Sequence, residues 1–215
     1  MRLFLLTLVV LALTTAGTAA GDKTKPVTFS KDSSGKVPSG WTVAKTGKGE
    51  GSAWSVVADD SAPGKTGFAL MQTADSPTAM FNLCVQEDSR FMDGEVEVKF
   101  KAVKGDHDQG GGIVWRYQDA NNYYVARMNP LEDNLRLYKV VDSKRLQLAT
   151  DDKVKAEAGT WHTLKIKHVG KQIEVWMNGK KLLEAADDTF AKAGKVGLWT
   201  KADAQTRFDM LVIRK

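Results

Sequence analysis

Residues 110–141 read GGGIVWRYQDANNYYVARMNPLEDNLRLYKVV, the most informative segment of the chain. Two runs within it, Ile113 to Gln118 and Tyr123 to Asn129, are rich in the aromatic and β-branched residues that favour strands. The Asp-Ala-Asn-Asn segment at 119–122 between them has the composition of a tight turn. A third run, Asn134 to Val140, alternates leucine with arginine and tyrosine. The segment therefore predicts three consecutive antiparallel strands.

The register of the first hairpin sorts its side chains onto two faces. With Gln118 opposite Tyr123, we expect one face to lie in the core and the other to meet water. The expected core face carries Trp115, Tyr117, Tyr124, Ala126 and Met128. The other face carries Val114, Arg116, Tyr123, Val125 and Arg127, and the third strand adds Arg136 and Tyr138 to it. The sequence therefore predicts a polar and aromatic surface on this sheet.

The rest of the chain repeats short strand signals. Gly94 to Lys101 alternates strictly, with valine and phenylalanine on one side and charges on the other. Trp161 to Val169 and Gln172 to Met177 form a second hairpin pattern, and Asn178-Gly179 marks a further turn. No helical period is sustained in residues 27–215. These features predict an all-β sandwich in which residues 27–215 form one domain.

Two weaker patterns lie toward the ends of this region. Val27 to Phe29 is expected to be the first strand, and residues 184–192 are expected to form a short helical turn or a loop. Residues 207–213 are apolar enough for a closing strand, which we expect to lie beside the N-terminal one.

The N-terminus has the pattern of an export signal. Met1-Arg2 precedes an apolar run from Leu3 to Leu13, and small residues follow as far as Ala20. A charged start, a short apolar segment and a small-residue cleavage site are the three parts of a secretory signal peptide. The run is shorter than the roughly 20 apolar residues that a spanning helix needs. We therefore expect residues 1–20 to be a signal peptide, residues 21–26 a flexible leader, and the mature chain to be periplasmic or extracellular without a membrane span.

Charge and cysteine content exclude several classes of protein. The formal net charge is +5, but the lysines are scattered among acidic residues without a basic block, so we expect no nucleic-acid partner. Cys84 is the only cysteine and lies in an alternating apolar run, which predicts a buried, inert thiol and no internal disulfide. The three histidines lack metal-ligand spacing, so we expect no zinc site.

Glu95 and Glu97 are the candidate catalytic residues. They lie two apart on one side of a predicted strand, with Cα atoms about 7 Å apart, a spacing that suits the two carboxylates of a glycoside hydrolase. The alternative is a solvated strand face on which glutamates alternate with lysines. The sequence leaves both interpretations open.

Candidate ligand-binding residues are the arginines and aromatic residues of the polar face. Flat aromatic rings stack on pyranose rings, and arginines bond sugar hydroxyls. The residues of these types are Arg116, Tyr123, Arg127, Arg136, Tyr138 and Trp176. The alternative is that the rings close the edges of the core while the arginines stack on them.

Five segments together resemble the secreted bacterial family named for 3-keto-disaccharide hydrolase, within the concanavalin A-like and laminin-G-like jelly rolls. They are residues 111–127, 159–165, 175–180, 194–200 and 208–209. The resemblance covers most of residues 27–213 and implies a jelly-roll β-sandwich of two curved antiparallel sheets. It also implies a concave face that holds carbohydrate in many relatives.

The resemblance bears on metals and catalysis as well. It implies a structural calcium ion near Asp209, and no other cofactor is expected. Related glucanases carry a third acidic residue on the catalytic strand, where this chain has Lys99. That departure weighs against Glu95 and Glu97 as a catalytic pair.

Three functions follow from these observations. The leading one is an exported domain that binds a carbohydrate or glycoside. Hydrolysis of that ligand, including 3-keto-glycosides, is a further step that the sequence leaves open. The alternative is a non-catalytic module of laminin-G-like type that recognises a protein or a cell-surface polymer through loops such as residues 105–112.

Overall fold

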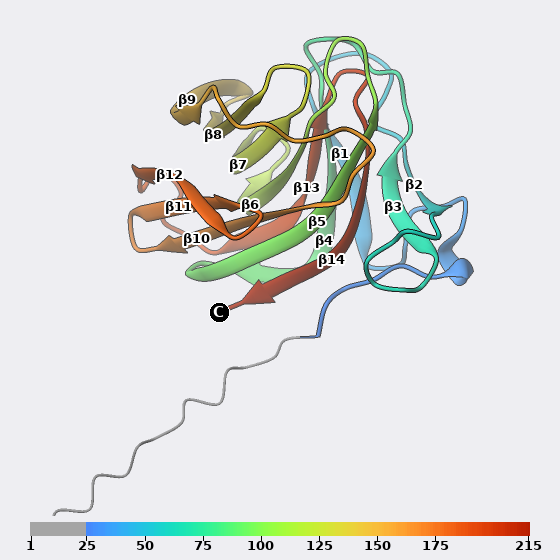
Figure 1. The fold of residues 1–215 in the computed structure, drawn as a ribbon. Coiled ribbons are helices and arrows are strands. Elements are labelled where there is room, and N and C mark those ends of the chain that lie inside the picture. Colours follow the sequence, from blue (N-terminus) through green and yellow to red (C-terminus); the bar gives the residue numbers. More distant parts are fainter. Residues whose placement is uncertain (1–24) are drawn as a thin grey trace, which may run out of the picture.

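The structure, a computed structural model, describes residues 25–215. Two antiparallel sheets of seven strands each pack face to face, with one 3-10 helix, η1 (Lys31–Ser33), before the first strand (Figure 1). The expected signal peptide and the first four leader residues lie outside the described residues. Among residues 25–215, none forms a helix long and apolar enough to cross a membrane.

The first sheet has the order β1-β4-β13-β6-β7-β8-β9. Its strands are β1 (Trp41–Thr46), β4 (Phe81–Phe91), β13 (Gly194–Lys201), β6 (Gly111–Asp119), β7 (Asn122–Asn129), β8 (Asn134–Val141) and β9 (Lys144–Asp151). The predicted three-stranded segment thus forms β6, β7 and β8, which are consecutive neighbours in this sheet.

The second sheet has the order β12-β11-β10-β5-β14-β3-β2. Its strands are β12 (Lys180–Ala186), β11 (Gln172–Met177), β10 (His162–Val169), β5 (Gly94–Lys104), β14 (Gln205–Arg214), β3 (Phe68–Gln72) and β2 (Trp54–Ala58). The second predicted hairpin is present as β10 and β11, with Leu164 opposite Met177. The all-β sandwich is therefore confirmed.

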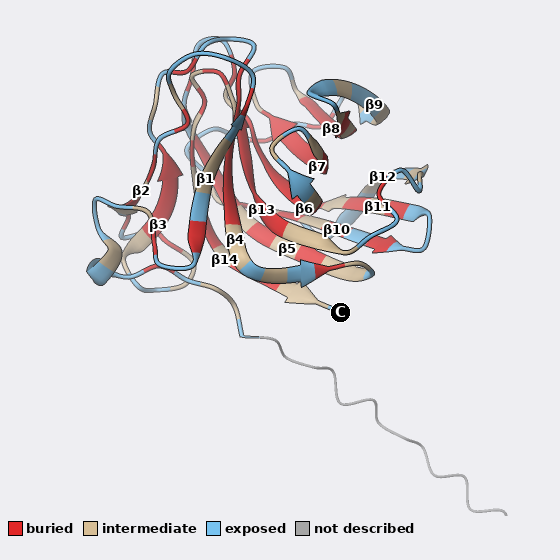
Figure 2. Ribbon diagram, turned by 180° about the vertical axis from the view of Figure 1, so that it is seen from behind, coloured by how far each residue is buried: buried red, intermediate tan, exposed pale blue. Residues whose placement is uncertain are grey.

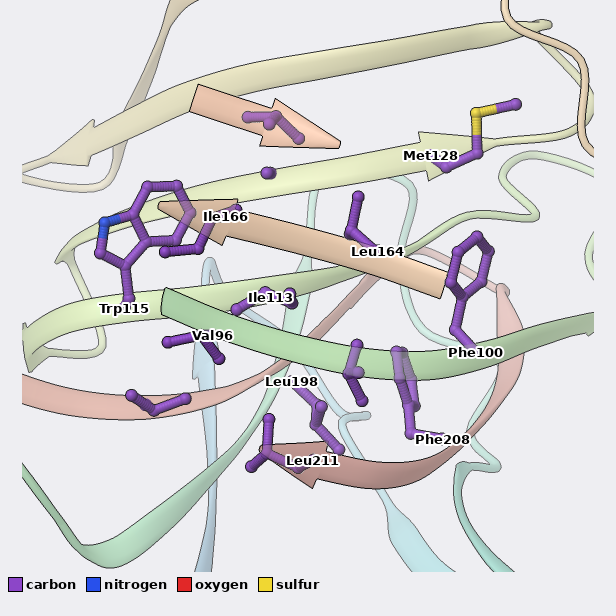
Figure 3. Close-up of a cluster of buried hydrophobic side chains, with 14 of the residues drawn as sticks. Val96, Phe100, Ile113, Trp115, Met128, Leu164, Ile166, Leu198, Phe208 and Leu211 are labelled. Carbon is purple, nitrogen blue, oxygen red and sulfur yellow. The ribbon is translucent and has the colours of Figure 1, made fainter. Parts of the chain in front are cut away.

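The main core lies between the two sheets. Val96 and Phe100 of β5 meet Ile113 and Leu198 of the first sheet there (Figure 3). Each such side chain contributes about 1.5–3 kcal/mol of stability by leaving water. Cys84 belongs to the same cluster and is fully buried, as predicted, and burial raises the pKa of its thiol.

The central hairpin departs from the predicted register. Trp115 pairs with Tyr124, whereas Asp119 pairs with Asn122, so a bulge lies between the two pairs. Arg116 has a positive φ of 43° within that bulge. A bulge interrupts the alternation of side chains. The prediction that Tyr117 faces the core and Arg116 the polar surface was therefore wrong: Tyr117 packs with the outer cluster and Arg116 bonds to loops at the end of the sandwich.

Two smaller expectations differ in part from the structure, and one strand was not expected. Val27 forms only an isolated bridge with Leu211, so residues 27–29 are not a strand, although this bridge does place the N-terminal segment beside the closing strand. Residues 184–186 continue β12, and residues 187–192 form a loop, which was one of the two alternatives expected for 184–192. Strand β9 was not predicted because, as an exposed edge strand, it mixes polar and apolar residues; Figure 2 shows it mostly exposed or half-buried, unlike β13.

Candidate functional site

The outer face of the first sheet is concave, and opposite parts of it touch. Thr46 on β1 places its hydroxyl 2.8 Å from the hydroxyl of Tyr123 on β7 and donates to Ala120 O at 2.5 Å. The guanidinium of Arg145 on β9 lies 5.1 Å from the ring centroid of Phe81 on β4. In the strand order, three strands separate β1 from β7 and four separate β4 from β9. Such contacts need a strongly coiled sheet, so we call this surface the concave face.

An apolar cluster fills the middle of the concave face. Leu83, Val114 and Val125 are fully buried there, beneath the rings of Phe81, Tyr123, Tyr138 and Trp199. Because the same strands also bury their other face in the main core, β6, β7 and the first half of β4 (81–85) are mostly apolar, as doubly covered strands are. The concave face is therefore a second core, and its polar groups lie around it.

Three arginines surround the ring of Tyr138, and we call them the arginine cluster. The guanidinium carbons of Arg127 and Arg145 lie 6.0 Å and 4.5 Å from the ring centroid. Arg136 Nη1 donates to the Tyr138 hydroxyl at 3.4 Å. Arg127 on β7 is the cross-strand partner of Arg136 on β8, Tyr138 follows two residues later, and Arg145 comes from the adjacent β9. Strand alternation and pairing thus bring the four side chains together.

Two carboxylates adjoin the arginine cluster in different states. Glu132 accepts hydrogen bonds from Arg127 Nη2 at 2.8 Å and Asn134 Nδ2 at 3.1 Å, which outweigh partial burial and lower its pKa. Asp108 is almost completely buried, and burial raises its pKa despite the N–H of Gly110 at 2.9 Å and Lys201 at 3.7 Å. The neighbourhood therefore holds one firmly ionised carboxylate and one whose charged form is disfavoured.

Several buried donors here lack an acceptor. Among residues 25–215, eight buried side-chain nitrogens have no hydrogen-bond partner, and five of them belong to the concave face: Arg127 Nε, Asn129 Nδ2, Arg136 Nε, Arg145 Nη1 and Trp199 Nε1. The Trp199 indole lies beside the Tyr123 phenol, which leaves four such nitrogens in the concave face. A buried donor left unmet costs about 1–3 kcal/mol. Such a concentration marks a place where a ligand or ordered water supplies acceptors.

The structure brings together four of the six predicted ligand-binding residues: Tyr123, Arg127, Arg136 and Tyr138. Arg116 is fully buried at the end of the sandwich and donates to Met92 O, Phe190 O and Gly170 O. Trp176 lies on the outer face of the second sheet, 4.2 Å from the ammonium of Lys165. These two residues are remote from the concave face.

Sequence reasoning missed Arg145, Asn129 and Glu132, and it did not place Asp108 near the arginines. Arg145 was missed because its strand was not recognised, while Glu132 and Asp108 lie in loops whose direction no periodicity predicts. Asn129 was within a predicted strand, and its alternation with Arg127 was the signal that places it on the same face.

Glu95 and Glu97 lie on the outer face of the second sheet. Glu95 is 3.5 Å from Lys165 and 3.8 Å from Arg214, and Glu97 has Lys165 as its cross-strand partner. Their side chains alternate with the core residues of β5, so the second sheet and the main core separate them from the arginine cluster. This placement favours the alternative of a charged, solvated sheet face.

The surroundings of Asp209 do not suit a calcium ion. Its carboxylate accepts the N–H groups of Gly64 at 2.7 Å and Met210 at 2.8 Å. The neighbouring carboxylate of Asp59 is taken by Lys101 at 2.5 Å and Arg207 at 2.8 Å. Calcium takes six to eight oxygen ligands, whereas N–H donors and two cations occupy these oxygens. Among the described residues, no group of three or more histidine, cysteine, aspartate or glutamate side chains could hold a metal ion.

Comparison with solved structures identifies the fold. The carbohydrate-binding module CBM66 from Bacillus subtilis aligns with a TM-score of 0.63 at 19% identity, over 80% of this chain and 93% of that chain. A GH16 protein of the mixed-linkage glucan locus of Bacteroides ovatus aligns with a TM-score of 0.57 at 11% identity, over 87% and 97% of the two chains. At these identities the likeness confirms the jelly-roll fold. No curated protein matches the chain.

Comparison with protein families gives a match along almost the whole of the described chain. The profile of the 3-keto-alpha-glucoside-1,2-lyase-like domain matches residues 28–214. The match includes both sheets and every residue of the concave face discussed above, and it confirms the resemblance found in the sequence. This chain therefore belongs to the family of 3-keto-alpha-glucoside-1,2-lyase-like domains.

Proposed function

We propose that this domain binds a carbohydrate over the arginine cluster of the concave face. The observation that carries the proposal is the set of unpartnered donors on Arg127, Asn129, Arg136 and Arg145. Sugar hydroxyl and ring oxygens are acceptors of the kind these nitrogens lack, and the Tyr138 ring lies among them. A fold shared with carbohydrate-active proteins is consistent with this assignment.

Access to the site begins at its part-exposed members. The Arg136 side chain is 28% exposed and Glu132 is 41% exposed, while Arg127 and Asn129 lie beneath them. A ligand therefore meets Arg136 and Arg145 first. Both are long side chains, Arg145 on β9 at the edge of the sheet and Arg136 on the adjacent β8.

Thermal unfolding and calorimetric titration against a panel of oligosaccharides test the proposal. We expect at least one sugar to raise the melting temperature, because a ligand selective for the native state stabilises it. Arg136→Ala should weaken binding of that sugar about tenfold or more, since hydrogen bonds to charged groups contribute about 1.5–3 kcal/mol. The matched control is Arg90→Ala, which removes an exposed arginine near the far end of β4. Absence of any stabilising sugar, or equal binding by Arg136→Ala, would contradict the proposal.

Breakdown of a 3-keto-glycoside is the second candidate function. A ketone at C3 acidifies the proton on C2, and a base that removes this proton forms an enolate. Collapse of the enolate restores the ketone, forms a C1–C2 double bond and expels the glycosidic oxygen from C1, which leaves as an alcohol after taking a proton from the protonated base or from water. Glu132 lies 2.8 Å from Arg127 and 3.8 Å from Arg136, which supplies a carboxylate base beside cations suited to an enolate oxygen. Hydrolysis at the same bond would instead need the carboxylate pair that the sequence places at Glu95 and Glu97.

Two variants distinguish these chemistries on a 3-keto-α-glucoside. If Glu132 is the base, Glu132→Gln should lower turnover at least a hundredfold, within the usual contribution of general base catalysis, and the wild-type product should be the conjugated enone. If Glu95 and Glu97 hydrolyse the bond, Glu97→Gln should abolish turnover without a change in melting temperature. If the wild-type protein binds the 3-keto-α-glucoside without converting it, both the elimination and the hydrolysis are excluded and the binding function remains.

A further inference from the structure

The balance of charge in the arginine cluster is incomplete. Arg127 pairs with Glu132 at 2.8 Å, and Arg136 reaches Asp152 at 3.4 Å and Glu132 at 3.8 Å. Among residues 25–215, no carboxylate pairs with Arg145, and its side chain makes no hydrogen bond. Of the three guanidinium groups, Arg127 and Arg136 thus have carboxylate partners, Glu132 and Asp152, and Asp152 is 60% exposed.

Arg145 is held in place by aromatic rings alone. Its guanidinium lies 4.5 Å from the Tyr138 centroid and 5.1 Å from the Phe81 centroid. Cation–π contacts of this kind contribute about 0.5–2 kcal/mol each, which orients the side chain without satisfying its N–H groups. Its Nη1 is buried and has no acceptor. The rings therefore fix the guanidinium in a position in which its free N–H groups can bond to a ligand.

The chemistry of that partner follows from the shape of the guanidinium. A planar fork of N–H donors matches the two oxygens of a carboxylate, and such pairs are about twice as strong as neutral hydrogen bonds. A neutral sugar hydroxyl satisfies one N–H but leaves the positive charge uncompensated. The nearby buried carboxylate, Asp108, is associated with Lys201 at 3.7 Å instead. An anionic ligand accepts hydrogen bonds from the N–H groups and also balances the positive charge of Arg145.

We propose that the carbohydrate bound at the arginine cluster is acidic, with a carboxylate of the uronic acid type received by Arg145. This inference rests on the proposed carbohydrate-binding function and narrows it to a substrate class. Arg127 and Arg136 keep their own carboxylates and bond neutral oxygens of the sugar, while Arg145 selects the acid.

Matched pairs of sugars test the inference. The probes are uronic acid trisaccharides of gluco, galacto and manno configuration and their carboxyl-reduced neutral counterparts, titrated by calorimetry in 20 mM and 200 mM NaCl, roughly spanning the range in which screening by salt becomes strong. We expect at least one acid to bind tenfold or more tightly than its neutral counterpart, with a smaller ratio at the higher salt. Arg145→Gln should bring that ratio to about one, and Arg145→Lys, which keeps the charge but loses the planar fork, should retain an intermediate ratio.

The control and the contrary outcomes are judged by the same quantity, the ratio of the affinity for an acidic sugar to that for its neutral counterpart. Arg90→Gln removes an exposed arginine nine residues along β4 from Phe81, the ring that Arg145 contacts, and should leave the ratio unchanged. If Arg145→Gln fails to fold, Arg145→Lys carries the test. Neutral sugars that bind as tightly as the acids would overturn this inference while leaving the proposed function in place. A ratio that persists in Arg145→Gln would likewise overturn it. Binding by none of these sugars would overturn the inference as well, while the wider oligosaccharide panel decides the proposed function separately.

Discussion

His168 ties the stability of the protein to pH through a single buried side chain. It is fully buried, and its Nδ1 accepts the indole N–H of Trp115 at 3.0 Å, so the ring is held neutral. Burial, with a further contribution from the positive charge of Arg116, lowers its pKa from 6.5 to about 4. The unfolded chain therefore takes up this proton first as the pH falls, and stability present above pH 6.5 is lost progressively toward pH 4.

Urea unfolding between pH 7 and pH 4.5 measures this effect. The full loss attributable to His168 is on the order of 3 kcal/mol, from about 1.4 kcal/mol for each unit of pKa difference. His168→Gln should show a flatter dependence on pH than the wild type, while His107→Gln, at an exposed position, should keep the wild-type slope. Identical slopes for the wild type and His168→Gln would show that His168 is not the titrating group. Asp108 and Asp209, whose pKa values burial raises, oppose the loss equally in all three proteins.

The bulge in β6 places Arg116 among loops at the end of the sandwich instead of on the polar surface where it was expected. Arg116 donates to Met92 O at 2.9 Å, Phe190 O at 3.1 Å and Gly170 O at 3.1 Å. These carbonyls belong to the β4–β5 turn, the segment before β13 and the β10–β11 turn, so one side chain joins both sheets at this end. Gly194 allows the bulge, because a Cβ there would lie 2.4 Å from the carbonyl carbon of Arg116.

Replacement of Arg116 should therefore affect stability and not binding. We expect Arg116→Met to lower the free energy of unfolding by about 3 kcal/mol, since three buried carbonyls lose a charged donor. Denaturant unfolding gives this value, and titration of the folded variant with the best oligosaccharide gives its affinity. A variant with wild-type stability and lost binding would instead place Arg116 in the ligand site, as the sequence predicted.

Local alternation explains which elements could be predicted. Strands β5, β10 and β11 alternate along their length, so their inward and outward residues follow from the sequence. Tyr123, Arg127, Arg136 and Tyr138 were placed on one face for the same reason. The bulge at Arg116 breaks the alternation without a glycine or proline inside it, and the edge strand β9 has little apolar periodicity, so Tyr117 was misplaced and Arg145 was missed.

The curvature of the whole first sheet brings the residues of the candidate site together. Contacts such as Thr46 with Tyr123 and Arg145 with Phe81 join residues that are distant both along the chain and across the sheet. Sheet curvature depends on the summed twist of seven strands and on packing against the second sheet. A local sequence pattern predicts neither of these. The concave face was therefore expected from family resemblance alone, while its closure over a second apolar core was not.

The same architecture separates the two sets of candidate residues. The arginine cluster lies on the concave face of the first sheet, whereas Glu95, Glu97 and Trp176 lie on the outer face of the second, with the main core between them. A ligand that contacts one set cannot contact the other. The location of the bound sugar thus decides which residues carry the function.

The most direct measurement is a map of amide chemical shifts in the labelled protein as the tightest-binding oligosaccharide of the panel is added. We expect the largest changes in β7, β8 and β9, centred on Arg127, Arg136, Tyr138 and Arg145. Changes centred instead on β5, β10 and β11, around Glu97 and Trp176, would contradict this expectation.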